Sequence, residues 1–485
     1  METVFIEPVD ETFVKIKTNS GVAMELSEYL SFRVPGYQFM PKYRSGLWDG
    51  FFRLYNIKNS HVYKGLIYYI VKFCSDHNYK ISIDESLYDK NDISDSQIQT
   101  FIDGLDLKLT PRDYQITSFK NIINNKRAVI LSATGSGKSL TAYLIIKYLQ
   151  SIGKRGLLVV PTTSLVFQMF EDFKSYGFDS EEYAHCIVSG KEKYTDKFLT
   201  ISTWQSIVKL PKAYFKNYDF VIVDECHLAD AKSITSIVER CVNADYRIGM
   251  TGTLKGQKVH HLTLEGLFGP VFQATTTDAL IKKGQLSDIN IKCMVLNYPK
   301  EICKDIIKCD YRTEIGFLVE NKERNNYIKD LSLSLDGNTL VLFQFVEKQG
   351  KGLYELIKKS TNRKVFFIYG SIATDDREKI RGIVENETDA IIVASYGTFS
   401  TGINIVNLYN IILASPLKSR IKNLQSIGRA LRLNGKDKVA TLFDISDDCR
   451  YGKKYNFSLK HFLERVKIYN SENFKFSLHK VDLYT

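Results

Sequence analysis

Short runs of apolar residues recur through the middle of the chain, separated by segments with helical spacing. The earlier runs are Ala128–Leu131, Gly156–Val160, Phe198–Ser202, Phe220–Val223 and Arg247–Met250. The later runs are Thr339–Phe343, Lys364–Tyr369, Ala390–Ala394, Asn410–Leu413 and Val439–Asp444. Apolar strands spaced by helices are typical of a parallel sheet covered on both faces. The pattern therefore predicts two successive α/β domains, the second beginning near Asp288.

The first hundred residues follow a different pattern. Alternating segments at Thr12–Ile16 and Gly65–Ile70 predict short strands of a small α+β domain, and the polar run Tyr88–Gln99 predicts a surface loop or linker. We therefore expect an accessory N-terminal domain (1–105), two α/β domains (106–285 and 286–450) and a basic C-terminal extension (451–485).

The extension contains one amphipathic segment, predicted to be helical over Ser458–Tyr469. Its apolar face is formed by Leu459, Phe462, Leu463, Val466 and Tyr469. We expect this helix to dock on the second core and to leave Lys460, Arg465 and Lys467 facing outward.

Composition is that of a globular protein, with 485 residues, 44% hydrophobic and 25% charged. No apolar run approaches a membrane span, the N-terminus lacks a basic segment followed by an apolar core, and the 8 cysteines form no Cys-x-x-Cys pair. We expect no membrane partner, no secretory signal and a cytoplasmic location.

The formal net charge of +11 favours a polyanionic partner. Residues 411–485 carry 15 Lys/Arg against 7 Asp/Glu, whereas residues 1–110 carry 12 against 15. A solvated basic surface would also explain this excess.

A glycine-rich segment lies between the run Ala128–Leu131 and the helical stretch Leu140–Leu149. Its sequence is Ala133-Thr134-Gly135-Ser136-Gly137-Lys138-Ser139. A strand, a glycine-rich turn and a helix start cradle a phosphate chain, because backbone N–H groups and the positive helix end face the anion. Lys138 is predicted to reach the β- and γ-phosphates and the Ser139 hydroxyl to hold Mg²⁺. The cofactors expected are therefore ATP and Mg²⁺, although Ser132 stands where this motif usually opens with glycine.

Two acids follow the run Phe220–Val223, 86 residues after Lys138. Asp224 at a strand end is predicted to organise Mg²⁺ through its waters, and Glu225 to orient and deprotonate the attacking water. His227 is predicted to link this site to the Thr251-Gly252-Thr253 turn and so to couple it to the rest of the domain.

Two further segments are candidates for the same nucleotide. Upstream of the glycine-rich turn, Arg112 and Gln115 begin a helix after Pro111, and a Gln side chain suits the adenine edge because it both donates and accepts. In the second α/β domain, Gln425, Arg429 and Arg432 fall on one helix face. Two guanidinium groups there suit a phosphate chain whose charge grows during the reaction, although a solvated basic stripe has the same pattern.

Aromatic residues alternate with basic ones between Tyr37 and Arg53. Lys42, Arg44, Trp48 and Arg53 are candidates for stacking on bases and touching phosphates of DNA. A hairpin whose aromatics form a small core is an equally good interpretation.

Together these motifs resemble the superfamily 2 helicases and translocases, from about Leu109 to Asp444. The resemblance implies two RecA-like domains that bind ATP in the cleft between them. It also implies that Asp224 and Glu225 are metal and water residues, that Arg429 and Arg432 are arginine fingers, and that Gln115 reads adenine.

The nearer resemblance is to the phage UvsW-type helicases. It is carried by the blocks Tyr43–Gly50, Asp224–His227 and Val393–Gly397, and so extends to the N-terminal domain. It implies an enzyme that remodels branched DNA by fork regression, four-way junction migration or removal of RNA from loops, in the host cytoplasm if phage-encoded. Two positions depart from relatives: Thr251-Gly252-Thr253 replaces Ser-Ala-Thr, and Asn404 replaces a frequent Asp.

Strand-end segments are further predicted to hold nucleic-acid phosphates through amides and hydroxyls, without reading sequence. These residues are Pro161, Thr162, Thr163, Thr203, Gln205, Ser395, Thr401 and Gly402. Three functions stay open: a DNA branch-migration helicase, a helicase for RNA or RNA–DNA hybrids or a duplex translocase serving a nuclease, and a nucleotide-gated binding module without catalysis.

Overall fold

The computed structural model describes most of the chain. The described residues are 2–88, 91–133, 135–188, 190, 192–230, 232–254, 258–285, 289–370, 372, 380, 382–384, 386–400, 407–416, 439–471 and 473–484. They form two compact units, one holding Met1–Ser132 and Gly137–Ala274, the other holding Ala133–Ser136 and Thr275–Thr485. Each unit is described by itself.

The first unit begins with a small sheet of four strands in the order β5-β2-β1-β6. The strands are β1 (Thr3–Pro8), β2 (Phe13–Lys17), β5 (His61–Tyr63) and β6 (Lys80–Ile83), and the helices are α1 (Ser20–Tyr29) and α3 (Ile67–Asp76). β1 pairs antiparallel with β2 and parallel with β6. The predicted small α+β domain is thereby confirmed.

Two local predictions in this region are wrong. Gly65–Ile70 is not a strand, because Leu66, Ile70 and Phe73 are buried at helical spacing while Tyr68 between them is exposed. The polar segment before the first large sheet is a loop only as far as Ser94. From there Ser94 and Gln97 form a capping box that starts α4 (Asp95–Asp103).

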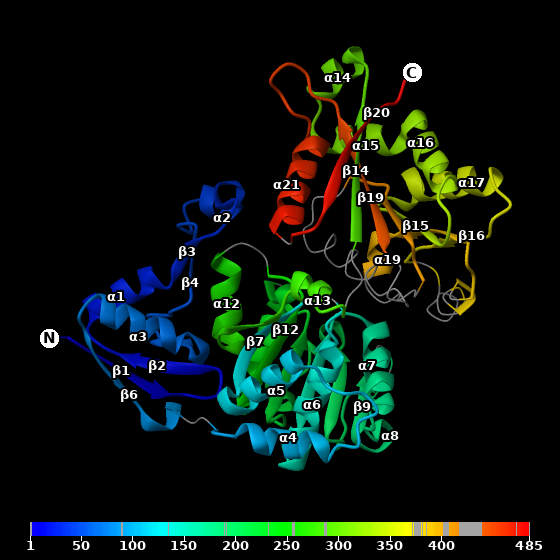
Figure 1. Ribbon diagram of the computed structural model, residues 1–485. Helices are drawn as coiled ribbons and strands as arrows, with labels where there is room; N and C mark the ends of the chain where they lie inside the picture. The colour runs from blue at the N-terminus through cyan, green and yellow to red at the C-terminus, as the bar shows by residue number, and fades with distance from the viewer. Residues whose placement is uncertain are drawn as a thin grey trace. The chain divides into compact units, whose positions relative to one another are not determined.

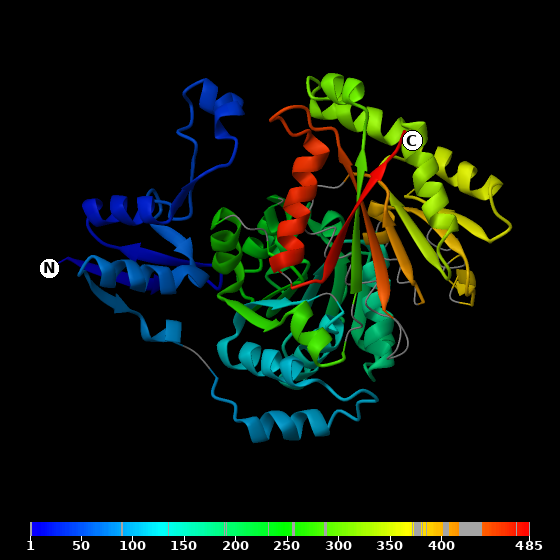
Figure 2. The same cartoon turned by 45° about the horizontal axis from the view of Figure 1, so that its top comes forward.

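A two-stranded ribbon projects from the small sheet and contains the alternating aromatic and basic residues. Its strands β3 (Ser31–Arg33) and β4 (Phe51–Arg53) pair antiparallel, and α2 (Pro41–Arg44) lies at its far end. Figures 1 and 2 both show α2 extending away from β1 and β2. We refer to residues 31–53 as the ribbon.

The rest of the first unit is a seven-stranded sheet in the order β13-β7-β12-β11-β8-β10-β9. Its strands are β7 (Arg127–Ser132), β8 (Gly156–Val160), β9 (Ala184–Ile187), β10 (Leu199–Thr203), β11 (Phe220–Asp224), β12 (Tyr246–Thr251) and β13 (Val271–Thr275). All pairs from β7 to β9 are parallel. The five predicted strands are confirmed to within a residue or two, whereas the edge strands β9 and β13 were not predicted.

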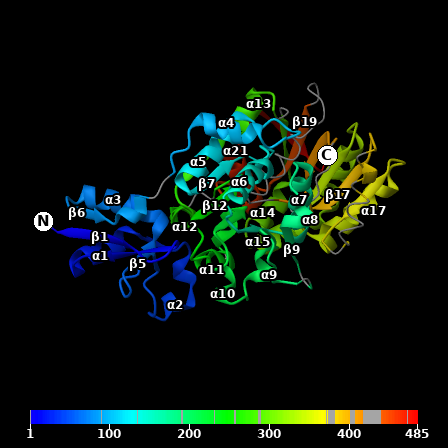
Figure 3. The same cartoon turned by 90° about the horizontal axis from the view of Figure 1, so that it is seen from below.

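Helices cover both faces of this sheet, because successive residues of its central strands are apolar and therefore present apolar side chains to both faces. On one face, Ile222 of β11 packs with residues of α5 (Asp113–Asn125), α6 (Lys138–Ser151) and α7 (Thr163–Ser175). On the other, Val221 and Val223 pack with α11 (Lys232–Arg240), α12 (Lys258–Phe268) and the short α9 (Trp204–Ile207) and α10 (Lys212–Phe215). Figure 3 shows α5 and α6 on one side of β7 and β12, and α10 and α11 on the other.

The N-terminal domain shares the core of this second face. Tyr63 and Val62 belong to the same buried cluster as Leu264 of α12, and Gly65 lies so close to α12 that a Cβ there would be 2.0 Å from the Glu265 carbonyl oxygen. Only glycine fits that approach.

Buried Arg247 of β12 completes this junction. Its Nη1 donates to Thr12 Oγ1 (2.9 Å) and to the Cys241 carbonyl (3.1 Å), Nε donates to the Leu267 carbonyl (3.1 Å), and Nη2 donates to the Val238 carbonyl. Burial lowers the pKa of this guanidinium to about 9. The N-terminal domain is thus joined to the first sheet by a fully buried cation, and both form one unit.

The second unit contains a sheet in the order β16-β17-β15-β18-β19-β14-β20, with all pairs parallel. The strands are β14 (Ile289–Asn297), β15 (Thr339–Phe343), β16 (Val365–Ile368), β17 (Ile391–Ser395), β18 (Asn410–Leu413), β19 (Ala440–Asp448) and β20 (Phe476–Asp482). The helices include α14 (Lys300–Ile306), α15 (Tyr311–Glu320), α16 (Lys322–Leu333), α17 (Lys351–Lys359), α19 (Tyr396–Ser400) and α21 (Phe457–Ser471). The two tandem RecA-like parallel sheets are confirmed, although β14 and β20 were not predicted.

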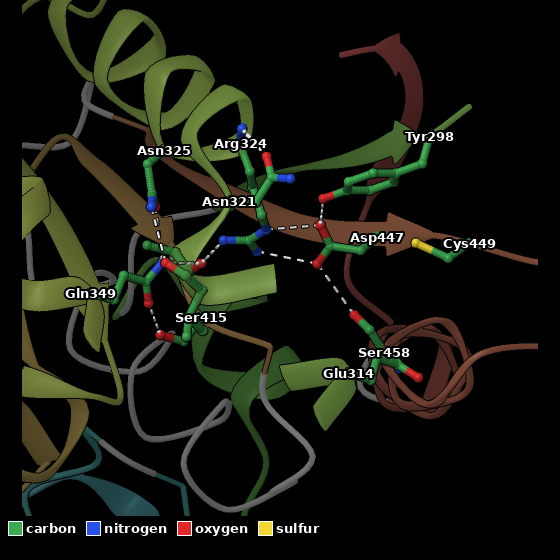
Figure 4. Close-up of polar contacts among 12 residues, drawn as sticks. Tyr298, Glu314, Asn321, Arg324, Asn325, Gln349, Ser415, Asp447, Cys449 and Ser458 are labelled. Atoms are coloured by element: carbon green, nitrogen blue, oxygen red, sulfur yellow. Dashed lines mark hydrogen bonds and ion pairs between the residues drawn. The ribbon is translucent and has the colours of Figure 1, made fainter. Parts of the chain in front are cut away.

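A buried ion pair joins the carboxyl ends of several strands in this unit (Figure 4). Arg324 Nε donates to Asp447 Oδ1 (2.8 Å), and Arg324 Nη1 donates to the Ala414 carbonyl at the end of β18 (2.7 Å). Tyr298 Oη donates to the same Asp447 oxygen (2.8 Å). Helix α16 and strands β14, β18 and β19 are thereby tied together at one edge of the sheet.

The prediction for the C-terminal helix is wrong at two positions. Arg465 does not face outward: it is buried and donates two hydrogen bonds to Asp444, 2.9 Å and 2.8 Å long. Leu463, expected in the apolar face, is instead 43% exposed. Leu459, Phe462 and Tyr469 are buried as predicted, so the buried face is only widened toward Arg465. The buried carboxylate of β19 explains this, because it needs a cationic partner away from water.

No helix among the described residues is long and apolar enough to cross a membrane.

Replacing Arg247 with leucine should destabilise the first unit. The change leaves Thr12 Oγ1 and three carbonyl groups without their donor, which costs about 3 kcal/mol or more in the free energy of unfolding. Both tryptophans, Trp48 and Trp204, lie in the first unit, so urea unfolding followed by tryptophan fluorescence measures it. The matched control is Arg465→Leu, a buried arginine of the second unit, which should leave the tryptophan transition in place. An unchanged midpoint for Arg247→Leu would contradict the junction described above.

Candidate active site

The glycine-rich turn joins β7 to α6 in the first unit. Gly135 and Gly137 have φ angles of 85° and 78°, in the left-handed region that favours glycine. Lys138 is the first residue of α6, and its Nζ lies 3.3 Å from the Ser132 carbonyl oxygen. Ala133 and Ser136 are buried, and Thr134 lies outside the described residues. The predicted strand, turn and helix are therefore all in place.

Gln115 connects α5 to this turn. Its Oε1 accepts from the Arg112 backbone N–H (2.8 Å), and its Nε2 donates to the Gly137 carbonyl (3.1 Å). A Cβ at position 137 would lie 2.6 Å from that Nε2. The Arg112 guanidinium donates to Tyr114 Oη (2.9 Å). The amide predicted to read adenine is thus buried and fixed against the turn, and adenine recognition stays a prediction.

Ser139 has a neighbour that sequence reasoning missed. Its Oγ lies 3.0 Å from Tyr176 Oη, and the Tyr176 ring packs edge-on against Tyr143, with centroids 5.5 Å apart. Tyr176 follows α7, 37 residues along the chain, and no motif in the sequence marks it.

Asp224 ends β11 and is buried among apolar strands. Its Oδ1 has no hydrogen-bond partner among the described residues. Burial, and then the negative charge of Glu225, raise the pKa of this carboxyl to about 7, while the Lys138 charge acts in the opposite direction. A buried carboxylate oxygen without a donor, close to a phosphate-binding lysine, fits a magnesium ligand that acts directly or through water.

Glu225 is held in an unusual backbone conformation. Its φ is 50°, which non-glycine residues seldom adopt and which costs about 1 kcal/mol or more. The chain turns sharply here, so consecutive acids leave the strand end in different directions. Glu225 Oε2 lies 3.2 Å from His227 Nδ1.

His227 joins the acids to the end of β12. Its Nδ1 is 2.8 Å from Thr251 Oγ1, which in turn donates to the Thr253 carbonyl (2.8 Å). These contacts are all satisfied when Nδ1 carries the proton and Thr251 accepts it. Lys138, Asp224, Glu225, His227 and the turn Thr251-Gly252-Thr253 therefore gather at the carboxyl ends of β7, β11 and β12, where parallel sheets place ligand sites.

The predicted phosphate contacts of the first unit lie at neighbouring strand ends. Thr162 caps α7 after Pro161 at the end of β8, and Thr163 is exposed. Thr203 ends β10 and shares a hydrogen bond with Ser206 (2.9 Å), while Gln205 is exposed. Because β8 and β10 are paired, these segments share one edge of the sheet.

In the second unit the structure describes only part of the candidates. Ser395 ends β17, is largely buried, and its Oγ is 2.7 Å from Thr398 Oγ1. Thr401, Gly402, Asn404, Gln425, Arg429 and Arg432 lie outside the described residues. Their roles stay predictions.

The ribbon shows features of both interpretations given for it. Its aromatics pack on one another, with Phe32 stacked on Phe52 (5.4 Å between centroids) and Tyr37 edge-on to Tyr43 (4.6 Å). Trp48 Nε1 donates to the Phe51 carbonyl (2.8 Å), and Arg53 is paired with Asp49. Lys42 and Arg44 are exposed, as is Leu47 at 81%. The exposed cations of the ribbon that pair with no described acid are therefore Lys42 and Arg44 on α2, and Arg33 on β3.

Replacing Asp224 with asparagine should stabilise the first unit above neutral pH. The folded-state pKa of about 7 lies above the ordinary value of 3.8, so the folded protein keeps a proton that the unfolded chain has lost. Stability therefore falls as pH rises from about 4 to 7, by at most about 1.4 kcal/mol per pH unit, and then levels off. Asparagine removes this loss.

The measurement is urea unfolding by tryptophan fluorescence at pH 5 and pH 8, without nucleotide and with EDTA. The gain for Asp224→Asn should be larger at pH 8 than at pH 5, whereas exposed Asp76→Asn should show none. If Asp224→Asn were less stable than the parent at pH 8, the claim that the Asp224 carboxylate is buried without a compensating partner would be wrong.

Family models match three parts of the chain. A model described as "DNA helicase UvsW, N-terminal" matches residues 5–84, one described as "Type III restriction enzyme, res subunit" matches 108–256, and one described as "Helicase conserved C-terminal domain" matches 323–434. The N-terminal match includes the ribbon.

Whole-chain relatives give the same picture. The ATP-dependent DNA helicase uvsW of Enterobacteria phage T4 is 34% identical over 98% of both chains, and the crystal structure of T4 UvsW matches 99% of this chain and 100% of its own, at 32% identity and a TM-score of 0.54. The DNA 3'-5' translocase XPB2 of Sulfurisphaera tokodaii is 24% identical over 70% of this chain and 82% of its own. With two RecA-like sheets, a matching N-terminal domain and a full-length relative of this identity, the chain belongs to the UvsW family of superfamily 2 DNA helicases.

Proposed function

We propose that this protein is an ATP-dependent DNA helicase that unwinds or branch-migrates forked and four-way-junction DNA. The observation that carries the catalytic part is the buried, unpartnered Asp224 oxygen beside the Lys138 turn and Glu225. A protein that only binds nucleotide has no need of a costly carboxylate at this place. The T4 relative supports DNA as the substrate.

The residues of the first unit take distinct roles in this proposal. The N–H groups of residues 135–139 and the Lys138 ammonium bind the β- and γ-phosphates, and Ser139 and Asp224 hold Mg²⁺. The metal, when bound, neutralises charge on the phosphate oxygens. Glu225 accepts the proton of the attacking water, and its strained backbone fixes the carboxylate for that task.

The neighbouring residues connect hydrolysis to DNA. Gln115 and Arg112 recognise adenine in this proposal. Because Gln115 donates a hydrogen bond to the Gly137 carbonyl, adenine binding would shift the glycine-rich turn. His227 contacts both Glu225 and the Thr251–Thr253 turn. Loss of the γ-phosphate therefore changes the hydrogen bonds at the end of β12. Gln425, Arg429 and Arg432 supply guanidinium and amide groups to the transferring phosphate in the ATP-bound state.

DNA is held by its phosphates at the strand ends and by the ribbon. The segments Pro161–Thr163, Thr203–Gln205, Ser395 and Thr401–Gly402 contact one strand through hydroxyls and amides, while Lys42 and Arg44 contact the junction arms. Trp48 and Arg53 are bonded within the ribbon and remain candidates for contact with DNA. The proposed location is the cytoplasm, which is that of the host cell if the protein is phage-encoded.

Branched DNA should stimulate ATP hydrolysis most strongly. We expect four-way junctions and forks to exceed duplex and single strands, and RNA or RNA–DNA hybrids to stimulate weakly, because the ribbon adds contacts that only a branch point offers. Phosphate release and strand separation on this panel of substrates measure the order. Stimulation by RNA above that by every DNA would favour the RNA-helicase alternative.

Two variants, measured on the same nucleic-acid substrates, test the catalytic roles of Lys138 and Glu225. Lys138→Ala should lose hydrolysis on every substrate, while Glu225→Gln should keep nucleotide binding and lower turnover by about 10²- to 10⁴-fold. Exposed Glu171→Gln on α7 is the matched control. Wild-type turnover in Lys138→Ala would remove the catalytic assignment.

His227→Ala should separate hydrolysis from strand separation. Loss of the Nδ1 contacts frees the Thr251 turn from Glu225, so unwinding should fall about tenfold more than ATP hydrolysis on the same fork. His227→Asn, whose Nδ2 can replace Nδ1 as donor, should restore part of the ratio. Equal losses of both activities in His227→Ala would contradict a coupling role.

A further inference from the structure

The loop between β19 and α21, residues Arg450–Asn456, is a basic and aromatic surface of the second unit. It turns tightly, with Tyr451 and Lys454 bridged by two backbone hydrogen bonds of 3.1 Å. Tyr451 and Tyr455 are 43% and 46% exposed, although aromatic rings are usually covered. Such rings between lysines are the pattern that binds bases and phosphates together.

The lysines of this surface are free of acidic partners. Lys453, Lys454 and Lys460 are exposed and form no ion pair with any acid that the structure describes. Nearby acids are already engaged: Asp448 is paired with Arg450 (2.6 Å), and Asp305 with Lys308 (3.1 Å). Three positive charges are therefore left to an external anion.

A cavity of about 370 Å³ opens beside these lysines. Its wall includes Ile306 and Ile307 at the end of α14, and Tyr455 and Phe457 from the loop and the start of α21. Lys460 Nζ lies 5.3 Å from the centre of the Phe457 ring. The lining is mixed, because Lys453, Lys454 and Lys460 belong to it together with these apolar and aromatic side chains. Such a combination suits a flat base attached to a phosphate chain.

One acid lines the cavity, and its carboxylate is bonded to the loop and to the start of α21. Glu314 of α15 is fully buried, and its carboxylate accepts from Asn456 Nδ2 (3.0 Å) and from the backbone N–H groups of Phe457 (2.8 Å) and Ser458 (2.6 Å). The bonds at the start of α21 spread the carboxylate charge and fix the loop. The surface is thus preorganised, which lowers the entropy cost of binding.

The loop lies on the same sheet edge as a predicted nucleic-acid contact. It follows the carboxyl end of β19, and β19, β18, β15 and β17 are successive parallel neighbours with Phe343 opposite Ser395. The Arg324–Asp447 pair fixes the strand ends between them (Figure 4). A DNA strand bound near Ser395 would therefore lie on the same edge of the sheet as this basic loop.

We propose that the loop Arg450–Asn456, together with Lys460 and the adjoining cavity, is a second binding site for single-stranded DNA. Lys453, Lys454 and Lys460 bind phosphates, and a base enters the cavity and stacks on Tyr455. The site rests on the proposed function, since it serves the strand on which the enzyme moves. An acidic protein segment is the rival occupant, and the exposed rings of Tyr451 and Tyr455 beside the lysines favour nucleic acid.

The test is DNA binding by the full chain carrying Lys453→Glu and Lys454→Glu together. Anisotropy of a fluorescein-labelled oligothymidylate, measured over a range of salt, should show at least tenfold weaker binding. The slope of log K against log salt should fall by about 1.4, because each lost single-strand phosphate contact removes about 0.7. The thermal midpoint should match the parent, since both side chains are exposed. Lys358→Glu with Lys359→Glu, two exposed lysines at the end of α17, is the matched control and should bind like the parent.

A second variant examines the base. Tyr455→Ala should weaken binding about tenfold with an unchanged salt slope, because it removes stacking but no charge. Parental affinity in the lysine variant, an unchanged salt slope in that variant, or an equal loss in the α17 control would each overturn the proposal. If the parent itself shows no DNA-stimulated ATP hydrolysis, the proposed function fails instead, and the salt slopes still decide whether this surface binds DNA.

Discussion

The first unit depends on a carboxylate that the fold buries without a partner. Asp224 ends a strand that is buried throughout, and its Oδ1 accepts no hydrogen bond from the described residues. A buried group of this kind costs free energy in the absence of a ligand, as its raised pKa shows. The paired strands β7, β12 and β11, with α6 behind them, must therefore hold this edge rigid so that the cost is recovered when a cation and a phosphate chain arrive.

Elsewhere the fold treats buried charge in the opposite way. Arg247, Arg324 and Arg465 are each fully buried, and each donates at least two hydrogen bonds to acceptors on other elements. Arg247 joins the N-terminal domain to the first sheet, whereas the other two tie helices of the second unit to β19. Satisfied charges of this kind fix one arrangement of the chain, because any other arrangement would leave them unpaired. Asp224 differs from these three arginines because its Oδ1 has no partner among the described residues, which is the basis for proposing it as a ligand-binding group.

The sequence could predict what depends on local pattern. Apolar runs located the central strands of both sheets, and the glycine-rich turn located Lys138, because each follows from residues close in the chain. Edge strands β9 and β20 were missed, since their exposed positions carry no apolar run. The strand predicted at Gly65–Ile70 was wrong, because a short apolar run fits a buried helix as well as a strand.

What could not be predicted depends on distant partners. The rotation of α21 is decided by Arg465 and an aspartate 21 residues earlier, and neither position shows a local signal. The same holds for Tyr176 beside Ser139, and for Gln115, whose amide is bonded to the turn it was expected to accompany. The sequence therefore predicted which residues form the candidate site, but it did not predict the hydrogen bonds that orient them.

These contacts bear on how a motor of this family divides its work. The ribbon, the Arg247 junction and the Asp224 edge belong to one compact unit, so the proposed DNA contacts Lys42 and Arg44 move with the first sheet. The basic loop after β19 belongs to the other unit and is fixed there through Glu314. A translocating enzyme needs a grip on DNA in each unit, because hydrolysis moves DNA only when the two grips tighten and release in turn. Lysines on the ribbon of the first unit and on the loop after β19 of the second unit meet that requirement better than one continuous basic surface would.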